Sequence, residues 1–312
     1  MGRSKRDKKP DLAERPDFAA ETVPLTAEEV QLFDPLKTNF IWYKPPLATE
    51  DSHETGGHQW CVAGHDMQVL TMTVPAGETI ITEVGSFMYM HPGMETQVEC
   101  TLCKMNTCGE AWKRVCGGES CVKVLLINES DEQGYVGLTP NFPAKVIPIK
   151  FGTHIESGRN MITKGGAYMA ELGDVDVGCS LDCSIATCCC AGLGCCRQKL
   201  SGSDGSIAFL NAGGTIVYKH LKEGETVTVD TGSLVGFEDS VHMGIRFNGS
   251  FCTCCFGGEG CFSTTLTGPG RVYMQSMSFQ RFQAAVMQTI TEEERGGDSN
   301  TGMDIATEIL GP

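Results

Sequence analysis

The sequence predicts an all-β protein in which three pseudo-equivalent, β-sandwich-like units surround a pseudo-threefold axis within one chain. The chain has 312 residues, with 38 glycines and only 7% aromatic residues, a balance that suits turns and bulges better than helix interiors. Short runs such as VLTMTV, VKVLLI and TVTVD are rich in β-branched residues and lie between turns that carry glycine or proline. A glycine-punctuated pattern also recurs three times along the chain.

The first element is a proline-rich flexible leader, which we expect over residues 1–58. It contains one expected short helix at TAEEVQLF, where Thr26 and Glu29 have the spacing of a capping box. The segment DSHETGGH reads as a linker because its glycines argue against a helical zinc motif. The basic cluster GRSKRDKKP at the start is interpreted as a solvated tail, with weak attraction to an anionic membrane as the alternative.

The second element is a β domain over residues 59–288, which contains the repeat. Residues 75–90 (PAGETIITEVGSFMYM) and 222–237 (KEGETVTVDTGSLVGF) align without gaps, and residues 156–171 form a weaker third copy. In each copy a glycine suits a tight connection, a strand follows, and a second glycine, Gly166 in the weaker copy, ends or bends the strand. Three similar units that cannot each bury a face alone should share one core around a threefold axis.

The third element is an acidic flexible tail over residues 289–312, which ends in EEERGGDSNTGMDIATEILGP. The back halves of the units also recur, as LTPNFPAKVI at 138–147 and LTGPGRVY at 266–273, with FLNAGGTIVYKH at 209–220 between them. The repeat therefore covers most of the predicted β domain.

The chain has 17 cysteines, and all but Cys61 fall in three segments, one in each unit. An odd count without a secretory signal predicts free thiols in a reducing compartment rather than a disulfide framework. If the units are related by rotation, the three segments emerge at a common pole of the molecule.

These cysteines have three competing interpretations. They could hold zinc or copper(I), since thiolates are soft ligands; no other cofactor is expected, and the metal candidates are Cys100, Cys103, Cys252, Cys254, Cys255 and Cys261. They could be S-acylated and so anchor the chain to a membrane; the candidates are Cys188, Cys189, Cys190, Cys195 and Cys196. They could also serve simply as small hydrophobic residues.

The C-terminal part of the β domain carries a resemblance to a known family. The stretch at 212–241 is followed by GGEGCF, LTGPG and a QS dipeptide, and this order resembles the altered-inheritance-of-mitochondria (mitochondrial biogenesis) family over residues 60–288. The resemblance implies a fold similar to that of trp RNA-binding attenuation protein. The family has no established reaction, so the resemblance implies no catalytic activity. It does imply a role in mitochondrial biogenesis.

Composition and motifs narrow the function further. The net charge of −15 disfavours nucleic acid, and the sequence holds neither a nucleophile elbow nor a phosphate-binding loop, so we expect no enzyme. The prediction is a non-enzymatic scaffold or interaction protein, in contact with a membrane through its cysteine pole; the alternative is a thiol-based metal-binding or redox protein. The partner is an unknown protein or a membrane surface, and self-association stays open.

The location predicted from the sequence alone is the cytoplasm. We find no presequence, signal peptide or run of about 20 apolar residues that would span a membrane. The resemblance implies the mitochondrion as the alternative.

Overall fold

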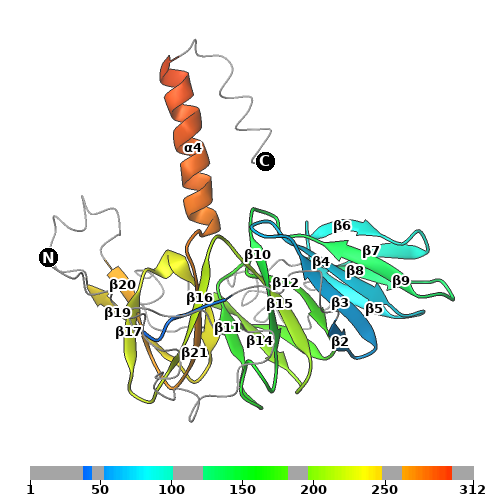
Figure 1. Ribbon diagram of the computed structural model, residues 1–312, viewed down its shortest axis with the longest axis horizontal. Coiled ribbons are helices and arrows are strands. Elements are labelled where there is room, and N and C mark those ends of the chain that lie inside the picture. Colours follow the sequence, from blue (N-terminus) through cyan, green and yellow to red (C-terminus); the bar gives the residue numbers. More distant parts are fainter. Residues whose placement is uncertain (1–37, 44–52, 101–121, 182–195, 248–261, 297–312) are drawn as a thin grey trace, which may run out of the picture.

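The described part of the chain is mostly β-structure, which confirms the predicted fold class. The computed structural model describes residues 38–43, 53–100, 122–181, 196–247 and 262–296. They form strands β1 to β21, one short 3₁₀ helix and one α-helix (Figure 1). The predicted helix at residues 26–33 lies outside the described residues.

Eighteen of the strands form three units of six consecutive strands each. Unit 1 comprises β4 (Val69–Val74), β5 (Thr79–Glu83), β6 (Phe87–Met90), β7 (Met94–Cys100), β8 (Val122–Asn128) and β9 (Gly134–Leu138). Unit 2 comprises β10 (Lys145–Lys150), β11 (Met161–Thr163), β12 (Tyr168–Leu172), β13 (Val175–Leu181), β14 (Cys196–Gly202) and β15 (Ile207–Ala212). Unit 3 comprises β16 (Ile216–Leu221), β17 (Thr226–Val229), β18 (Leu234–Glu238), β19 (His242–Phe247), β20 (Phe262–Thr267) and β21 (Gly270–Gln275).

The three units share one antiparallel pairing scheme. In each unit the first strand pairs with the sixth, the second with the fifth, the third with the sixth and the fourth with the fifth. The pairing of third and sixth strands is irregular at the same place each time, namely Phe87/Tyr89, Tyr168/Ala170 and Leu234/Gly236. The repeat seen in the sequence is therefore a repeat of strand topology.

The first glycine of each sequence copy explains part of this regularity. Gly77, Gly158 and Gly224 have φ angles of 78°, 77° and 75°, in the left-handed region that L side chains rarely adopt. Each lies in the turn before the second strand of its unit, so the glycine pattern marks the same turn three times.

Neighbouring units share sheets through strand pairing. The second strand of one unit pairs with the third strand of the next, as β5 with β12 and β11 with β18; we call these two pairings the inner junctions. They create a six-stranded sheet in the order β10-β15-β12-β5-β8-β7 and a seven-stranded sheet in the order β1-β16-β21-β18-β11-β14-β13. A five-stranded sheet, β2-β3-β4-β9-β6, and a three-stranded sheet, β17-β20-β19, remain at the two ends.

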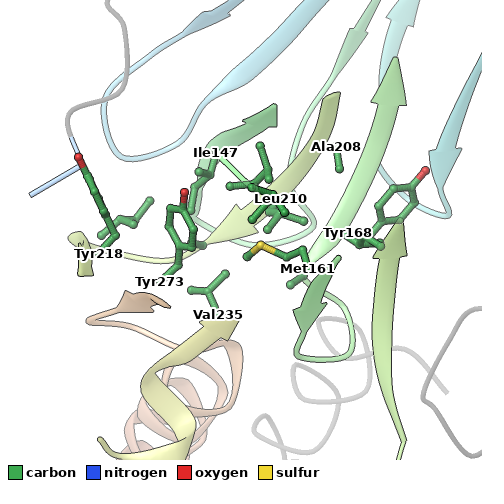
Figure 2. Close-up of a cluster of buried hydrophobic side chains, with 14 of the residues drawn as sticks. Ile147, Met161, Tyr168, Ala208, Leu210, Tyr218, Val235 and Tyr273 are labelled. Carbon is green, nitrogen blue, oxygen red and sulfur yellow. The ribbon is translucent and has the colours of Figure 1, made fainter. Parts of the chain in front are cut away.

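Three hydrophobic clusters lie between these sheets. Strand β15 is buried along its whole length because its alternate residues enter different clusters: Phe209 packs with unit 1, whereas Leu210 packs with unit 3. Figure 2 shows Leu210 and Ile147 of unit 2 gathered with Tyr218 and Tyr273 of unit 3. A strand covered on both faces reads as a continuous apolar run, which agrees with the IAFLNA sequence of β15.

The described strands do not show the threefold closure that we expected. A closed ring would need a third junction, between β17 and β6, and in the described residues β17 pairs only with β20 and β6 only with β9. The three-stranded and five-stranded sheets lie at opposite ends of the long axis in Figure 1. Units 1 and 2 each contribute their second, fourth and fifth strands to the sheet of the next unit, whereas those of unit 3 form the three-stranded sheet, so the described units stand in a row.

The boundaries of the β domain differ from the predicted ones. Strands β1 (Ile41–Trp42) and β2 (His53–Thr55) lie within the predicted leader, and β2 forms a hairpin with β3 (His58–Ala63). The glycines that suggested a linker, Gly56 and Gly57, instead form its turn with positive φ. The body therefore begins before residue 58.

A helix, α4 (Phe279–Gly296), crosses the boundary predicted at residue 288 and projects from the body in Figure 1. Its first turn is attached to unit 3 by Arg281, which forms an ion pair of 2.8 Å with Asp230. None of the described helices is both long and apolar enough to cross a membrane.

Candidate functional site

The cysteine segments all connect the fourth and fifth strands of a unit, but their residues 101–121, 182–195 and 248–261 lie outside the described residues. This covers every metal and acylation candidate except Cys100 and Cys196, which end β7 and begin β14 and whose side chains are also outside the description. The common pole, the metal site and the acylation site stay predictions. In the described part of the chain, no group of three or more histidine, cysteine or acidic side chains is arranged to hold a metal ion.

The strand β6 carries the most distinctive surface of the described residues. Phe87, Met88 and Tyr89 are 45%, 53% and 38% exposed. Val84 and Tyr135, which lie nearby on the turn before β6 and on strand β9, are also exposed. We call these five residues the β6 patch. Exposed apolar side chains along an edge strand and its neighbours are typical of an interaction site.

The same positions are buried in the other two units. Register with the sixth strand makes Phe87 equivalent to Tyr168 and Leu234, both of which are buried. Met88 is equivalent to Met169 and Val235, which are buried as well. The β6 patch therefore contains positions that belong to the core in units 2 and 3 but are exposed in unit 1.

The aromatic side chains of the patch are held in place by neighbours. The hydroxyl groups of Tyr89 and Thr71 form a hydrogen bond of 2.8 Å. The ring of Tyr89 lies over Gly137, where a Cβ atom would come within 2.3 Å of that ring. Tyr135 makes edge contacts with Tyr89 and with His91, at ring-centroid distances of 6.3 Å and 5.4 Å. Fixed rings of this kind lose little conformational entropy when they bind a partner.

A cavity of about 380 Å³ lies beside the first inner junction, between β5 and β12. Glu78, Glu171, Asp174 and His58 contribute to its lining. Three carboxylates make this cavity favour cationic groups or hydrogen-bond donors over anions. The Nδ1 atom of His58 donates a hydrogen bond of 2.9 Å to the carbonyl oxygen of Thr73, which fixes the orientation of the ring.

Glu171 is the buried member of this set. Its carboxylate accepts a hydrogen bond of 2.6 Å from the hydroxyl of Tyr168. Burial raises the pKa of Glu171, and the hydrogen bond from Tyr168 and the charge of Lys123 oppose the rise only in part. Burial likewise raises the pKa of Tyr168, so its hydroxyl stays protonated and available as a donor.

Glu171→Gln is expected to change how stability depends on pH. Because the folded pKa of Glu171 lies above its ordinary value of 4.5, the folded state binds the proton more tightly, and this residue's contribution to stability falls as pH rises above 4.5. The variant, which carries no titrating proton there, should lose less stability between pH 5 and pH 8 than the wild type. Urea unfolding at the two pH values measures this, and an equal loss in both proteins would contradict it.

Sequence reasoning missed both of these features. Glu171 lies at the end of the weaker copy of the repeat, where unit 1 has Met90 and unit 3 has Phe237. A polar residue at a position that is otherwise apolar was the available signal. Nothing in the sequence indicated that β6 is exposed, because FMYM has the apolar composition of a buried strand.

Known proteins resemble the chain as follows. Residues 60–277 match the protein family described as Mitochondrial biogenesis AIM24. No curated protein matches the chain. The X-ray structure of a structural-genomics target from Streptococcus pyogenes is similar with a TM-score of 0.57 and 19% identity, over 74% of this chain and 99% of that one; this likeness shows the fold alone. Neither likeness bears on trp RNA-binding attenuation protein, so that part of the expected resemblance stays a prediction.

Proposed function

Because the chain belongs to the mitochondrial biogenesis AIM24 family, we propose that it serves mitochondrial biogenesis as a non-enzymatic scaffold that binds a protein through the β6 patch. The observation that carries this proposal is the exposure of Phe87, Met88 and Tyr89 at positions that are buried in units 2 and 3. The family's mitochondrial connection favours the mitochondrion over the cytoplasm as the place of action.

The chemistry of the patch supports protein binding by strand addition. An edge strand offers a row of backbone donors and acceptors, and natural edges usually carry charges or proline to prevent pairing. Strand β6 carries neither, since its sequence is FMYM. Backbone pairing would supply affinity, and the aromatic side chains would supply specificity.

Two further roles stay proposals that rest on the sequence alone. Membrane contact through acylated cysteines and a thiol-based metal or redox site both depend on segments outside the described residues. The β6 patch, by contrast, can be tested directly.

The test compares two double variants in cells that lack the protein. Phe87→Ser with Met88→Ser removes the apolar side chains of the patch, whereas Met67→Ser with Val98→Ser changes two residues that are each 66% exposed and lie outside it. At equal abundance, the control should restore respiratory growth and the patch variant should not. Full restoration by the patch variant would overturn the proposal.

A further inference from the structure

The cavity beside the first inner junction is lined by a buried carboxylate that lacks a hydrogen-bond donor. Glu171 and Glu238 are equally buried, each 5% exposed. In Glu238 both oxygens are satisfied, because Oε1 accepts from the backbone N–H of Glu156 at 3.0 Å and Oε2 from that of Arg271 at 2.6 Å. In Glu171 the hydroxyl of Tyr168 satisfies Oε2, whereas Oε1 accepts no hydrogen bond from the described residues. An acceptor that is buried without a donor is costly, so a donor supplied by a ligand would be stabilising at Oε1.

A second acceptor in this cavity belongs to a side chain that is not acidic. His58 is 7% exposed and lines the cavity. Its Nδ1 atom donates to the carbonyl oxygen of Thr73, so Nε2 of the neutral ring is an acceptor and is the nitrogen left to face the cavity. Within the described ranges no residue donates to Nε2. Strands β3 and β12 therefore each bring one acceptor without a donor to the same cavity.

The rest of the lining combines acidic and apolar side chains. Glu78, in the turn before β5, and Asp174, in the turn after β12, are both exposed and place two more carboxylates on the cavity. Ile81 and Leu172 contribute apolar surface. No lysine or arginine is found among the described lining residues. Such a lining matches a ligand that carries positively charged N–H donors on an apolar chain.

At the second inner junction the equivalent residues bond to each other. The register of the two junctions makes Thr79 equivalent to Asn160 and Gly173 equivalent to Asp239. The Nδ2 atom of Asn160 donates a hydrogen bond of 2.6 Å to Oδ2 of Asp239, and the backbone N–H of Asp239 donates one of 2.9 Å to the carbonyl oxygen of Asn160. Because Gly173 has no side chain, this amide–carboxylate bridge cannot form at the first junction.

The charges also differ between the two junctions. Glu78 is equivalent to Arg159, and Glu171 is equivalent to Phe237. Phe237 packs in the hydrophobic cluster of unit 3, and Arg159 forms an ion pair of 3.5 Å with Glu156. The first junction therefore has two acids at positions where the second has a cation and an apolar ring.

We propose that this cavity binds an aliphatic polyamine. One ammonium group would donate to Glu171 and to Nε2 of His58, and a second would pair with the exposed carboxylates. The methylene chain between them would pack against Ile81 and Leu172. The volume of about 380 Å³ lies within the range of small-molecule sites, and an organic cation fits better than a metal ion, for which the described side chains form no ligand group. None of the lining residues belongs to the β6 patch, so this binding goes beyond the proposed function.

Isothermal titration calorimetry of the purified full chain with spermidine tests the proposal. The titration is run at an ionic strength of about 0.15 M, which screens exposed charges beyond about 8 Å. The wild type should bind one spermidine, and Glu171→Gln should bind it about 10-fold or more weakly, because a charge-assisted hydrogen bond is lost. Glu223→Gln removes the same charge from an exposed turn of unit 3 and should keep the affinity of the wild type.

A second variant tests the site at an exposed position, where folding is not at risk. Glu78→Arg gives the first junction the cation that Arg159 supplies at the second, and its guanidinium should compete with the ligand and weaken spermidine binding about 10-fold or more. Glu223→Arg makes the same change of net charge away from the cavity and should have little effect. Butylamine, which has one ammonium group, should bind about 10-fold or more weakly than spermidine.

Four results would overturn the proposal. The first is a wild type that shows no saturable binding of spermidine, and the second is unchanged affinity in Glu171→Gln. The third is equal weakening by Glu78→Arg and Glu223→Arg, which would reduce the binding to a general attraction of an acidic chain for polycations. The fourth is butylamine binding as tightly as spermidine, which would assign the cavity to a single ammonium group, such as the lysine side chain of a partner protein.

Discussion

Phe209→Ala should lower the free energy of unfolding by about 3–5 kcal/mol, the range typical of a buried phenylalanine replaced by alanine. Phe209 is 0% exposed and lies on β15, between β10 and β12 in the six-stranded sheet. Its ring meets that of Trp60 edge-on, with 5.1 Å between the centroids. The substitution therefore removes a contact that joins unit 2 to the β3 strand beside unit 1, and it leaves a cavity between two sheets.

Phe247→Ala is the matched control. Phe247 also has an edge-on ring partner, Phe262 at 5.6 Å, but it is 53% exposed at the end of β19. Its loss should change stability by less than about 1 kcal/mol. Urea unfolding of both variants measures the difference, and equal effects would mean that the cluster between units 1 and 2 does not stabilise the fold as the packing indicates.

Acid should destabilise the protein through His154, well before most carboxylates are protonated. His154 is 4% exposed, and its Nδ1 atom accepts a hydrogen bond of 3.0 Å from the backbone N–H of Lys150. Burial, with the charges of Arg271 and Lys150 beside it, lowers the pKa of His154 to about 3 from its ordinary value of 6.5. The folded state therefore holds the neutral ring.

The sign of the pH effect follows from proton binding. Between pH 6.5 and pH 3 the unfolded state binds the proton of His154 and the folded state does not, so stability is lost as pH falls through this window. Each pH unit well inside the window costs about 1.4 kcal/mol, which gives about 2 kcal/mol between pH 7 and pH 5.

His154→Asn separates this effect from other titrations. The asparagine oxygen keeps an acceptor near the N–H of Lys150 but does not titrate, so the variant should lose about 2 kcal/mol less than the wild type between pH 7 and pH 5. Guanidinium unfolding at both pH values measures the loss. If the variant and the wild type lose the same free energy, the acid sensitivity comes from other groups.

The repeat was readable in the sequence because glycine positions report backbone conformation directly. Gly77 and Gly224 lie in tight turns and have positive φ angles. In VLTMTV, buried residues of β4 alternate with half-buried ones. Helix α4 was missed because its apolar residues fall within a strongly polar segment that ends in EEER, which resembled a tail. The hairpin of β2 and β3 was missed because Gly56 and Gly57 suit a linker as well as a turn.

The sequence by itself determined the β class, the number of units, the turn positions and the family. Only the tertiary structure decided how the units join, which positions are covered and where Glu171 and Tyr168 meet. The physical reason is that turns and alternation depend on contacts local in the chain, whereas β5 and β12 are joined by contacts between distant residues such as Thr82 and Ala170. The row of units, and the positions of β6 and β17 at the outer edges of the described sheets, follow from those distant pairings.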